Sequence, residues 1–406
     1  MTVGRQASAT SRRSLLAAGA LFLVLQSVHL VVRPSEWLLD PRWAIDNYAF
    51  SLIFLGPAVA GCAAWQGRLF ARGRWIGRRS PRRYLGSLLV PVVALGELVF
   101  LAGLVSAVVV TVLTGAPFIV HLSDVISVLV AFLGIAAYGT AGFAVGSAWP
   151  NPVVAAAAAL TSFSLTLAAW IVGLEILVRF GGASGGVLGL DLRWQVHVIQ
   201  VLFWLLITGL SLLAAIRRVA STRLLSPLSV LLVVLLVGTA VTSSSVRGLF
   251  VQSEVPWTCD GSNPARCVPE TYRRFLDDLE FFPAPAAVAA DIVASAATTA
   301  SAWRLDDSLL FAQLRAGRGS DAEWYLVNDL QLLYWPGCMR DLSLILSEAQ
   351  QRAVDAIYAW SNFAGRSQSS AGDVSWTDSG VPLYPAGSAQ ARDFLGRQLA
   401  QLPACA

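Results

Sequence analysis

Hydrophobic residues gather in seven long segments within the first 243 residues, and polar residues become frequent after them. A helix needs about 20 apolar residues to cross the hydrocarbon core of a bilayer. The pattern therefore predicts seven membrane-spanning helices. The third is long enough to tilt, and Trp149-Pro150-Asn151-Pro152 predicts a tight hairpin between the fourth and fifth. The predicted spans are 15–32, 48–65, 85–113, 125–148, 153–178, 196–216 and 225–242.

Arginine is distributed unevenly between the two sets of segments that connect these spans. If residues 1–14 are cytoplasmic, the cytoplasmic segments carry thirteen arginines and the external loops carry four. Cytoplasmic loops are typically the ones enriched in basic residues. The bias predicts a cytoplasmic N-terminus in a bacterial cell membrane. An odd number of spans then puts residues 244–406 outside the cell as an extracellular domain.

Four of the five cysteines lie in residues 244–406. Disulfides persist in oxidising compartments, so this distribution independently favours an external C-terminal domain. Four cysteines allow three pairings. The short intervening loop favours a disulfide between Cys259 and Cys267, with a second between Cys338 and Cys405. Cys62 lies in the second span and is expected to be a free, buried thiol.

The C-terminal domain shows mainly helical periodicity, with Pro283 and Pro285 as breaks and a capping pattern at Ser347. Short strands within 305–314 or 381–383 remain an alternative. The predicted fold class is an all-α polytopic membrane protein of about seven transmembrane helices with a mainly α-helical, disulfide-bearing extracellular domain. Helices are predicted in that domain at 269–281, 286–302, 321–334, 347–362 and 389–402.

Composition agrees with a membrane protein, because 56% of residues are hydrophobic and 13% are charged, about half the charged share of soluble domains. All 29 basic residues are arginine, which indicates codon bias in a GC-rich genome and favours an actinobacterial source. The net charge of +4 does not indicate nucleic-acid binding, because the arginines beside the spans have a topological explanation.

Several catalytic classes lack their residues in this chain. The three histidines are His29, His121 and His197, so the C-terminal domain cannot contain a Ser-His-Asp or Cys-His site, or a zinc site with histidine. Without lysine there is no P-loop. We therefore expect no catalytic, cofactor or metal site. The carboxylates of Asp277, Asp278 and Glu280, which share one helix turn, or of the adjacent Asp306 and Asp307, could act as an acid and base pair, but a solvated helix face is favoured.

Charged residues inside the predicted spans are functional candidates, because a charge in hydrocarbon is costly. Glu97 lies near the middle of the third span and is expected to face Gln26, or else Tyr138 and Thr140. A structural hydrogen-bonding role and a role in a transport pathway are both open. Near the end of the fifth span, the spacing of Glu175 and Arg179 predicts an ion pair.

The predicted cytoplasmic segment 66–84 carries seven arginines interleaved with apolar side chains. Such a segment can lie on the anionic inner surface of the membrane lipid or dock a cytoplasmic partner. Its candidate partner-coupling residues are Arg68, Arg72, Arg74, Trp75, Arg78 and Arg79.

The first six spans resemble a permease of the type-2 ABC exporter class. In that class a cytoplasmic coupling element lies between helices two and three, where segment 66–84 stands here. A short re-entrant outer segment lies between helices five and six, where residues 180–190 stand here. Residues 49–57, followed by Ala63-Ala64-Trp65 and the arginine run, are similar to actinobacterial ABC permeases with an extra span and an external Cys-bearing domain. Residues 267–272, Cys-Val-Pro-Glu-Thr-Tyr, resemble a Cys-Val-His-Pro-x-Tyr segment of those proteins without its histidine.

This resemblance implies a transmembrane permease subunit of an ABC-type export system, working as a homodimer or as a heterodimer with a second permease. A separate cytoplasmic ATP-binding subunit would dock at 66–84. The alternative is a non-transporting membrane receptor or assembly protein whose external domain binds an envelope ligand. A membrane-embedded enzyme that uses Glu97 or the external carboxylates is a third interpretation.

Overall fold

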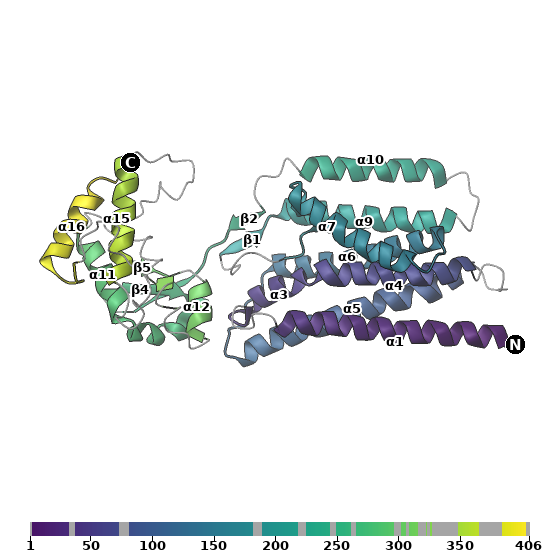
Figure 1. Cartoon of the computed structure of the whole chain (residues 1–406), viewed down its shortest axis with the longest axis horizontal. Coiled ribbons are helices and arrows are strands. Elements are labelled where there is room, and N and C mark those ends of the chain that lie inside the picture. The colour runs from purple at the N-terminus through teal and green to yellow at the C-terminus, as the bar shows by residue number, and fades with distance from the viewer. Residues whose placement is uncertain are drawn as a thin grey trace. The chain divides into compact units, whose positions relative to one another are not determined.

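The computed structural model describes residues 2–31, 37–72, 81–181, 189–217, 225–243, 249–260, 265–295, 302–305, 308–315, 322, 325–326, 348–364 and 384–402. The chain forms two compact units, Met1–Ser253 and Glu254–Ala406. Each unit has its own set of buried apolar side chains, and the first is a bundle of long helices that lie side by side (Figure 1).

Four described helices of the first unit are long and apolar enough to cross a membrane. They are α5 (Pro81–Leu113), α6 (Leu122–Ala148), α7 (Val154–Ile171) and α9 (Trp194–Arg217). The predictions of spans at 85–113, 125–148 and 196–216 coincide with three of these helices. The predicted span 153–178 is divided between α7 and the single turn α8 (Glu175–Val178), because Gly173 between them adopts a left-handed conformation with φ of 78°.

A fifth candidate span is made by two consecutive helices, α3 (Pro41–Phe50) and α4 (Leu52–Arg72), which meet at a bend of 41°. The Asp40 carboxylate caps α3 by accepting a 2.7 Å hydrogen bond from the Trp43 amide, and Pro41 suits the first helical position. The apolar parts of α1 (Thr2–Val31) and α10 (Leu225–Ser243) are shorter. The described chain is thus mainly helical with four or five candidate spans, and the count of seven stays a prediction.

The closest helix pair in the first unit is α4 with α6. Gly142 and Gly146 of α6 lie against the backbone of α4, where a Cβ atom would stand 2.0 Å from the Ala60 carbonyl oxygen and 1.9 Å from that of Ala64. Small residues at this spacing let two helices approach closely in a membrane. The two helices therefore form a tightly joined pair at the centre of the bundle.

The predicted hairpin between the fourth and fifth spans is confirmed. Helix α6 ends at Ala148 and α7 begins at Val154, with the two prolines in the turn between them. The Asn151 side chain accepts a 3.0 Å hydrogen bond from the amide of Val153 at the start of α7. The outward faces of the bundle carry large exposed apolar side chains, as expected for helices in lipid: Leu98, Val105, Leu160, Leu165, Ile171 and Val234.

The sequence did not predict the two-stranded sheet at one end of the bundle. Strand β1 (Leu190–Leu192) pairs antiparallel with β2 (Phe250–Gln252), and Asp191 lies opposite Val251. After α10 the chain therefore pairs with β1 of the first unit before the second unit begins. We call this the β1–β2 end of the bundle, and the opposite end, where α4 finishes, the Arg72 end (Figure 1).

The second unit combines helices with a small sheet that the helical periodicity did not predict. Strands β3 (Trp257–Cys259) and β4 (Ala265–Pro269) are antiparallel, and β5 (Ala302–Arg304) pairs parallel with β4. The predicted disulfide between Cys259 and Cys267 is present and joins β3 to β4. Cys338 and Cys405 lie outside the described residues, so their pairing stays a prediction.

Helices fill the rest of the described second unit. The predicted helix 269–281 consists of two 3₁₀ helices, Glu270–Phe275 and Asp277–Phe281. Tyr272 and Phe275 of the first pack against the Phe311 ring in tilted arrangements. Pro283 begins a helix where we predicted a break, since proline is well tolerated in the first turn. The remaining helices are α11 (Pro283–Ser295), α12 (Ser308–Arg315), α15 (Glu348–Ala364) and α16 (Ala389–Leu399).

The strand alternatives and the remaining predicted helices of the second unit have different outcomes. Residues 308–315 form α12, so the alternative of strand structure across 305–314 is wrong, and strand β5 ends before that range at Arg304. Most of the predicted helix 321–334 and the range 381–383 lie outside the described residues. The predicted helices at 347–362 and 389–402 correspond to α15 and α16.

Candidate functional site

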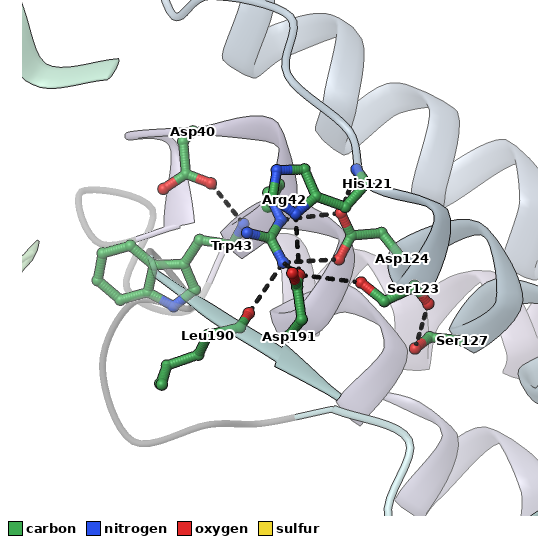
Figure 2. Close-up of polar contacts among 9 residues, drawn as sticks. All are labelled: Asp40, Arg42, Trp43, His121, Ser123, Asp124, Ser127, Leu190 and Asp191. Carbon is green, nitrogen blue, oxygen red and sulfur yellow. Dashed lines mark hydrogen bonds and ion pairs between the residues drawn. The ribbon is translucent and has the colours of Figure 1, made fainter. Parts of the chain in front are cut away.

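The polar residues at the β1–β2 end converge on Arg42 (Figure 2). Its Nε donates to Asp124 Oδ2 at 2.9 Å, and one terminal nitrogen donates to Asp191 Oδ1 at 2.6 Å and to the Leu190 carbonyl oxygen at 2.9 Å. The Arg42 side chain is only 6% exposed. One guanidinium therefore joins the beginning of α3 to α6 and β1.

Asp191 collects further donors around the same centre. The His121 ring nitrogen Nδ1 lies 2.9 Å from Asp191 Oδ1, and the Ser123 hydroxyl donates to that oxygen at 3.1 Å. The His121 amide donates to Asp124 Oδ2 at 2.8 Å, so both carboxylates contact the residues that begin α6. We call Arg42, His121, Ser123, Asp124 and Asp191 the Arg42 cluster.

Local structure explains how these side chains reach one another. Arg42 occupies the first turn of α3 directly after its Asp40 cap. Asp124 lies in the first turn of α6, where a negative charge is favoured by the helix dipole. Asp191 is the central residue of β1, which β2 holds in register. The first turns of α3 and α6 and the middle of β1 are thus brought to one point.

The surroundings of Asp191 favour its ionised form. Burial raises the pKa of Asp191, but the hydrogen bond from His121 and the positive charge of Arg42 outweigh it, and the net pKa lies below the ordinary value. Asp191 is thus held as the anion that Arg42 and His121 contact.

A small cavity adjoins the cluster. It has a volume of about 30 Å³ and is bordered by Arg42, Asp46, Ser127, Arg179 and Gln200. That volume holds about one or two water molecules, whereas small-molecule sites typically occupy several hundred Å³. The cavity suits water among polar groups rather than a transported solute.

The predicted coupling residues begin at the Arg72 end of the bundle. Arg68 is buried, with its guanidinium carbon 4.4 Å from the centre of the Trp65 ring. Arg72 is the last residue of α4 and donates to the Pro150 carbonyl oxygen at 3.2 Å. The beginning of segment 66–84 therefore contacts the α6–α7 turn. The other candidates, Arg74, Trp75, Arg78 and Arg79, lie outside the described residues.

Glu97 is half-buried on α5. Its predicted neighbours bond elsewhere: Gln26 accepts from Ser51 at 3.0 Å, Tyr138 shares a 2.7 Å hydrogen bond with Thr166, and Thr140 donates to a carbonyl of its own helix. Nothing in the described chain adds a partner that would favour a structural role over a pathway role for Glu97.

Two other predicted features have definite outcomes. The ion pair between Arg179 and Glu175 is confirmed, with 3.7 Å between Nη1 and Oε2. Cys62 is a free cysteine within α4, as predicted, but it is half-buried rather than buried. Across the described residues, no three His, Cys, Asp or Glu side chains are grouped so that they could hold a metal ion.

Sequence reasoning missed the Arg42 cluster. From the sequence, Arg42 is only one of the four external arginines, and neither His121 nor Asp124 is singled out as a site residue. A usable signal was present, because Arg42, Asp124 and Asp191 each lie next to the end of an apolar span on the same predicted side of the membrane. Opposite charges gathered on one side of a bundle are candidates for pairing.

No protein family model, curated protein or solved structure matches this chain.

Proposed function

We propose that this chain is a transmembrane permease subunit of an ABC-type export system, with a separate cytoplasmic ATP-binding subunit that docks on the segment following α4. In the proposed topology seven helices span the bacterial membrane and the N-terminus is cytoplasmic. The Arg72 end then faces the cytoplasm, and the Arg42 cluster and the second unit face the outside.

The observation that carries the proposal is the contact between Arg72 and the Pro150 carbonyl oxygen. It links the start of the candidate docking segment to the turn between α6 and α7. Because α6 is in backbone contact with α4 through Gly142 and Gly146, a force on that segment acts on three helices at once. This is the mechanical property that a coupling element needs.

The opposite end supplies the second requirement of a permease, a closure that can open. The Arg42 cluster holds α3, α6 and β1 together around a cavity too small for a solute. Alternating access requires two packings of similar stability, which ATP-driven movement at the Arg72 end would interconvert. In the second packing Arg42 would separate from Asp124 or Asp191. Pairing with an identical or second permease would complete the transport path.

The test is affinity purification of the tagged protein from native membranes in mild detergent, followed by mass spectrometry. We expect an ATP-binding subunit in stoichiometric amount. It should be lost when Arg72 and Arg74 are both changed to Glu, and retained in the control Arg13→Glu, which alters an exposed arginine of α1. Recovery of no ATPase from the unaltered protein would sink the exporter proposal.

The same experiment addresses the alternative of a membrane receptor or assembly protein. That alternative gains support from the second unit, which has its own apolar core and a disulfide. A stoichiometric envelope protein or glycan that is retained through residues 254–406, without any ATPase, would favour it.

A further inference from the structure

Arg68 is a buried cation without a counter-ion in the described chain. The residue is 9% exposed and lies one helical turn before the end of α4. Its Nε is buried and has no hydrogen-bond partner. Burying a charged donor is costly unless another group pairs with it. A site for an anion is therefore already formed on the protein side.

The surroundings of Arg68 add to this site. The Trp65 ring supports the guanidinium from one face at 4.4 Å and is itself only half-buried. Arg72 follows four residues later, on the same side of the helix, and is exposed. Two guanidinium groups and an aromatic ring thus lie together at the Arg72 end.

The sequence explains why no carboxylate pairs with Arg68. Residues 1–35, 47–96, 125–174 and 192–253 contain no Asp or Glu, and they include the described ends of α1, α4, α5, α6, α7 and α9 at the Arg72 end. The carboxylates of Asp124, Glu175 and Asp191 bond at or near the β1–β2 end instead. The described helices of the first unit therefore offer Arg68 no carboxylate, and an anion from another molecule would complete the site.

We propose that Arg68, Arg72 and Trp65 bind the phosphate of an anionic phospholipid at the membrane surface. Arginine pairs with phosphate through parallel N–H donors. Tryptophan is enriched at the depth of the lipid headgroups, and basic residues beside a span attract anionic lipids. Arg68 is buried one helical turn before the end of α4, whereas Arg72 is exposed. The carboxylates of a docked protein would reach Arg72 first, so the burial of Arg68 favours a lipid as its partner. The inference rests on the membrane placement of α4 and not on the exporter function.

The experiment measures lipid binding to the full-length protein by native mass spectrometry from detergent. The probes are phosphatidylglycerol, phosphatidylcholine with the same acyl chains, and inorganic phosphate. The unaltered protein is expected to retain phosphatidylglycerol in preference to phosphatidylcholine. Arg68→Gln should weaken that binding about tenfold, the loss of a charged hydrogen bond. The matched control Arg13→Gln removes an exposed arginine from α1 and should change binding less than twofold.

Each other outcome has a definite meaning. Equal binding of the two lipids, or unchanged phosphatidylglycerol binding in Arg68→Gln, would overturn the proposal. If millimolar inorganic phosphate displaces the lipid, the site binds free phosphate instead. If Arg68→Gln loses a protein partner but keeps its lipid, that protein supplies the counter-ion of Arg68. If Arg68→Gln does not fold, Arg72→Gln tests the exposed half of the site and should weaken lipid binding about threefold, without effect on phosphatidylcholine.

Discussion

Arg42 and Asp124 are 82 residues apart in the chain, yet Arg42 Nε lies 2.9 Å from Asp124 Oδ2. Their side chains are 6% and 12% exposed, so the pair is largely removed from water. The same guanidinium binds Asp191 of β1. A single cation therefore fixes the relative positions of two helices and of strand β1, which lies between α8 and α9 in the chain.

Removing that cation should destabilise the first unit. In Arg42→Gln, Asp124 and Asp191 remain close together without the charge that separates them. Breaking a buried ion pair on one side typically costs about 3 kcal/mol or more. We expect a loss of about that size in unfolding experiments on the purified protein in detergent, and a lower midpoint of thermal unfolding.

The matched control is Glu175→Gln, which breaks an ion pair at the same end of the bundle. Glu175 is 41% exposed and lies 3.7 Å from Arg179, and pairs of this kind contribute about 0.5 kcal/mol or less. Equal losses in the two variants would show that Arg42 is no more important than a surface charge.

Asp191 should make the stability of the first unit depend on acid pH. The pKa of Asp191 in the folded protein lies below its ordinary value, which is about 3.9 in an unfolded chain. Ionised Asp191 therefore stabilises the fold above that value, and the contribution disappears as the pH falls through the lower, folded pKa.

The measurement is a series of unfolding midpoints between pH 7 and pH 3 for the unaltered protein and for Asp191→Asn. The variant should be less stable at pH 7, and the difference between the two curves should shrink as the pH falls below about 4. A difference that stays constant with pH would mean that the charge of Asp191 is not what the cluster uses.

The backbone contact between α4 and α6 should not tolerate one added methyl group. In Gly142→Ala the Cβ atom would stand 2.0 Å from the Ala60 carbonyl oxygen, so the helices must separate. Overpacking of this kind costs about 3 kcal/mol. The control is Gly86→Ala on α5, where a Cβ atom meets nothing within 4 Å. Comparable unfolding midpoints for the two variants would contradict the close approach of α4 and α6.

Sequence reasoning located helices well because length and hydropathy are local properties. The hairpin at Pro150 and the Glu175–Arg179 pair followed from proline chemistry and from the helical repeat, and both are present. The disulfide between Cys259 and Cys267 followed from a short loop. Each of these depends on residues close together in the chain.

The features that sequence reasoning missed depend on residues far apart. Strand β1 pairs with β2 across about sixty residues of chain, and three-residue strands have no measurable periodicity. Arg42 acquires its partners only when α3, α6 and β1 meet. The orphaned Nε of Arg68 likewise follows from burial, which the arginine count of segment 66–84 does not reveal.

The disulfide of the second unit gives a direct test of the proposed topology. If residues 254–406 lie outside the cell, Cys259 and Cys267 should resist alkylation in protein from freshly lysed cells until a reductant is added, and peptide mass spectrometry should recover them joined. Cys62 within α4 is the internal control, because it is free and should be alkylated after denaturation without any reductant.

Loss of this bond should also weaken the second unit. A disulfide that closes so short a loop stabilises a fold by about 2 kcal/mol. The double variant in which Cys259 and Cys267 become Ser should therefore unfold more readily in residues 254–406, measured by limited proteolysis, while the helices of the first unit keep their protection. Both cysteines found reduced in cells would argue that the second unit faces the cytoplasm, and the proposed orientation of the whole bundle would have to be reversed.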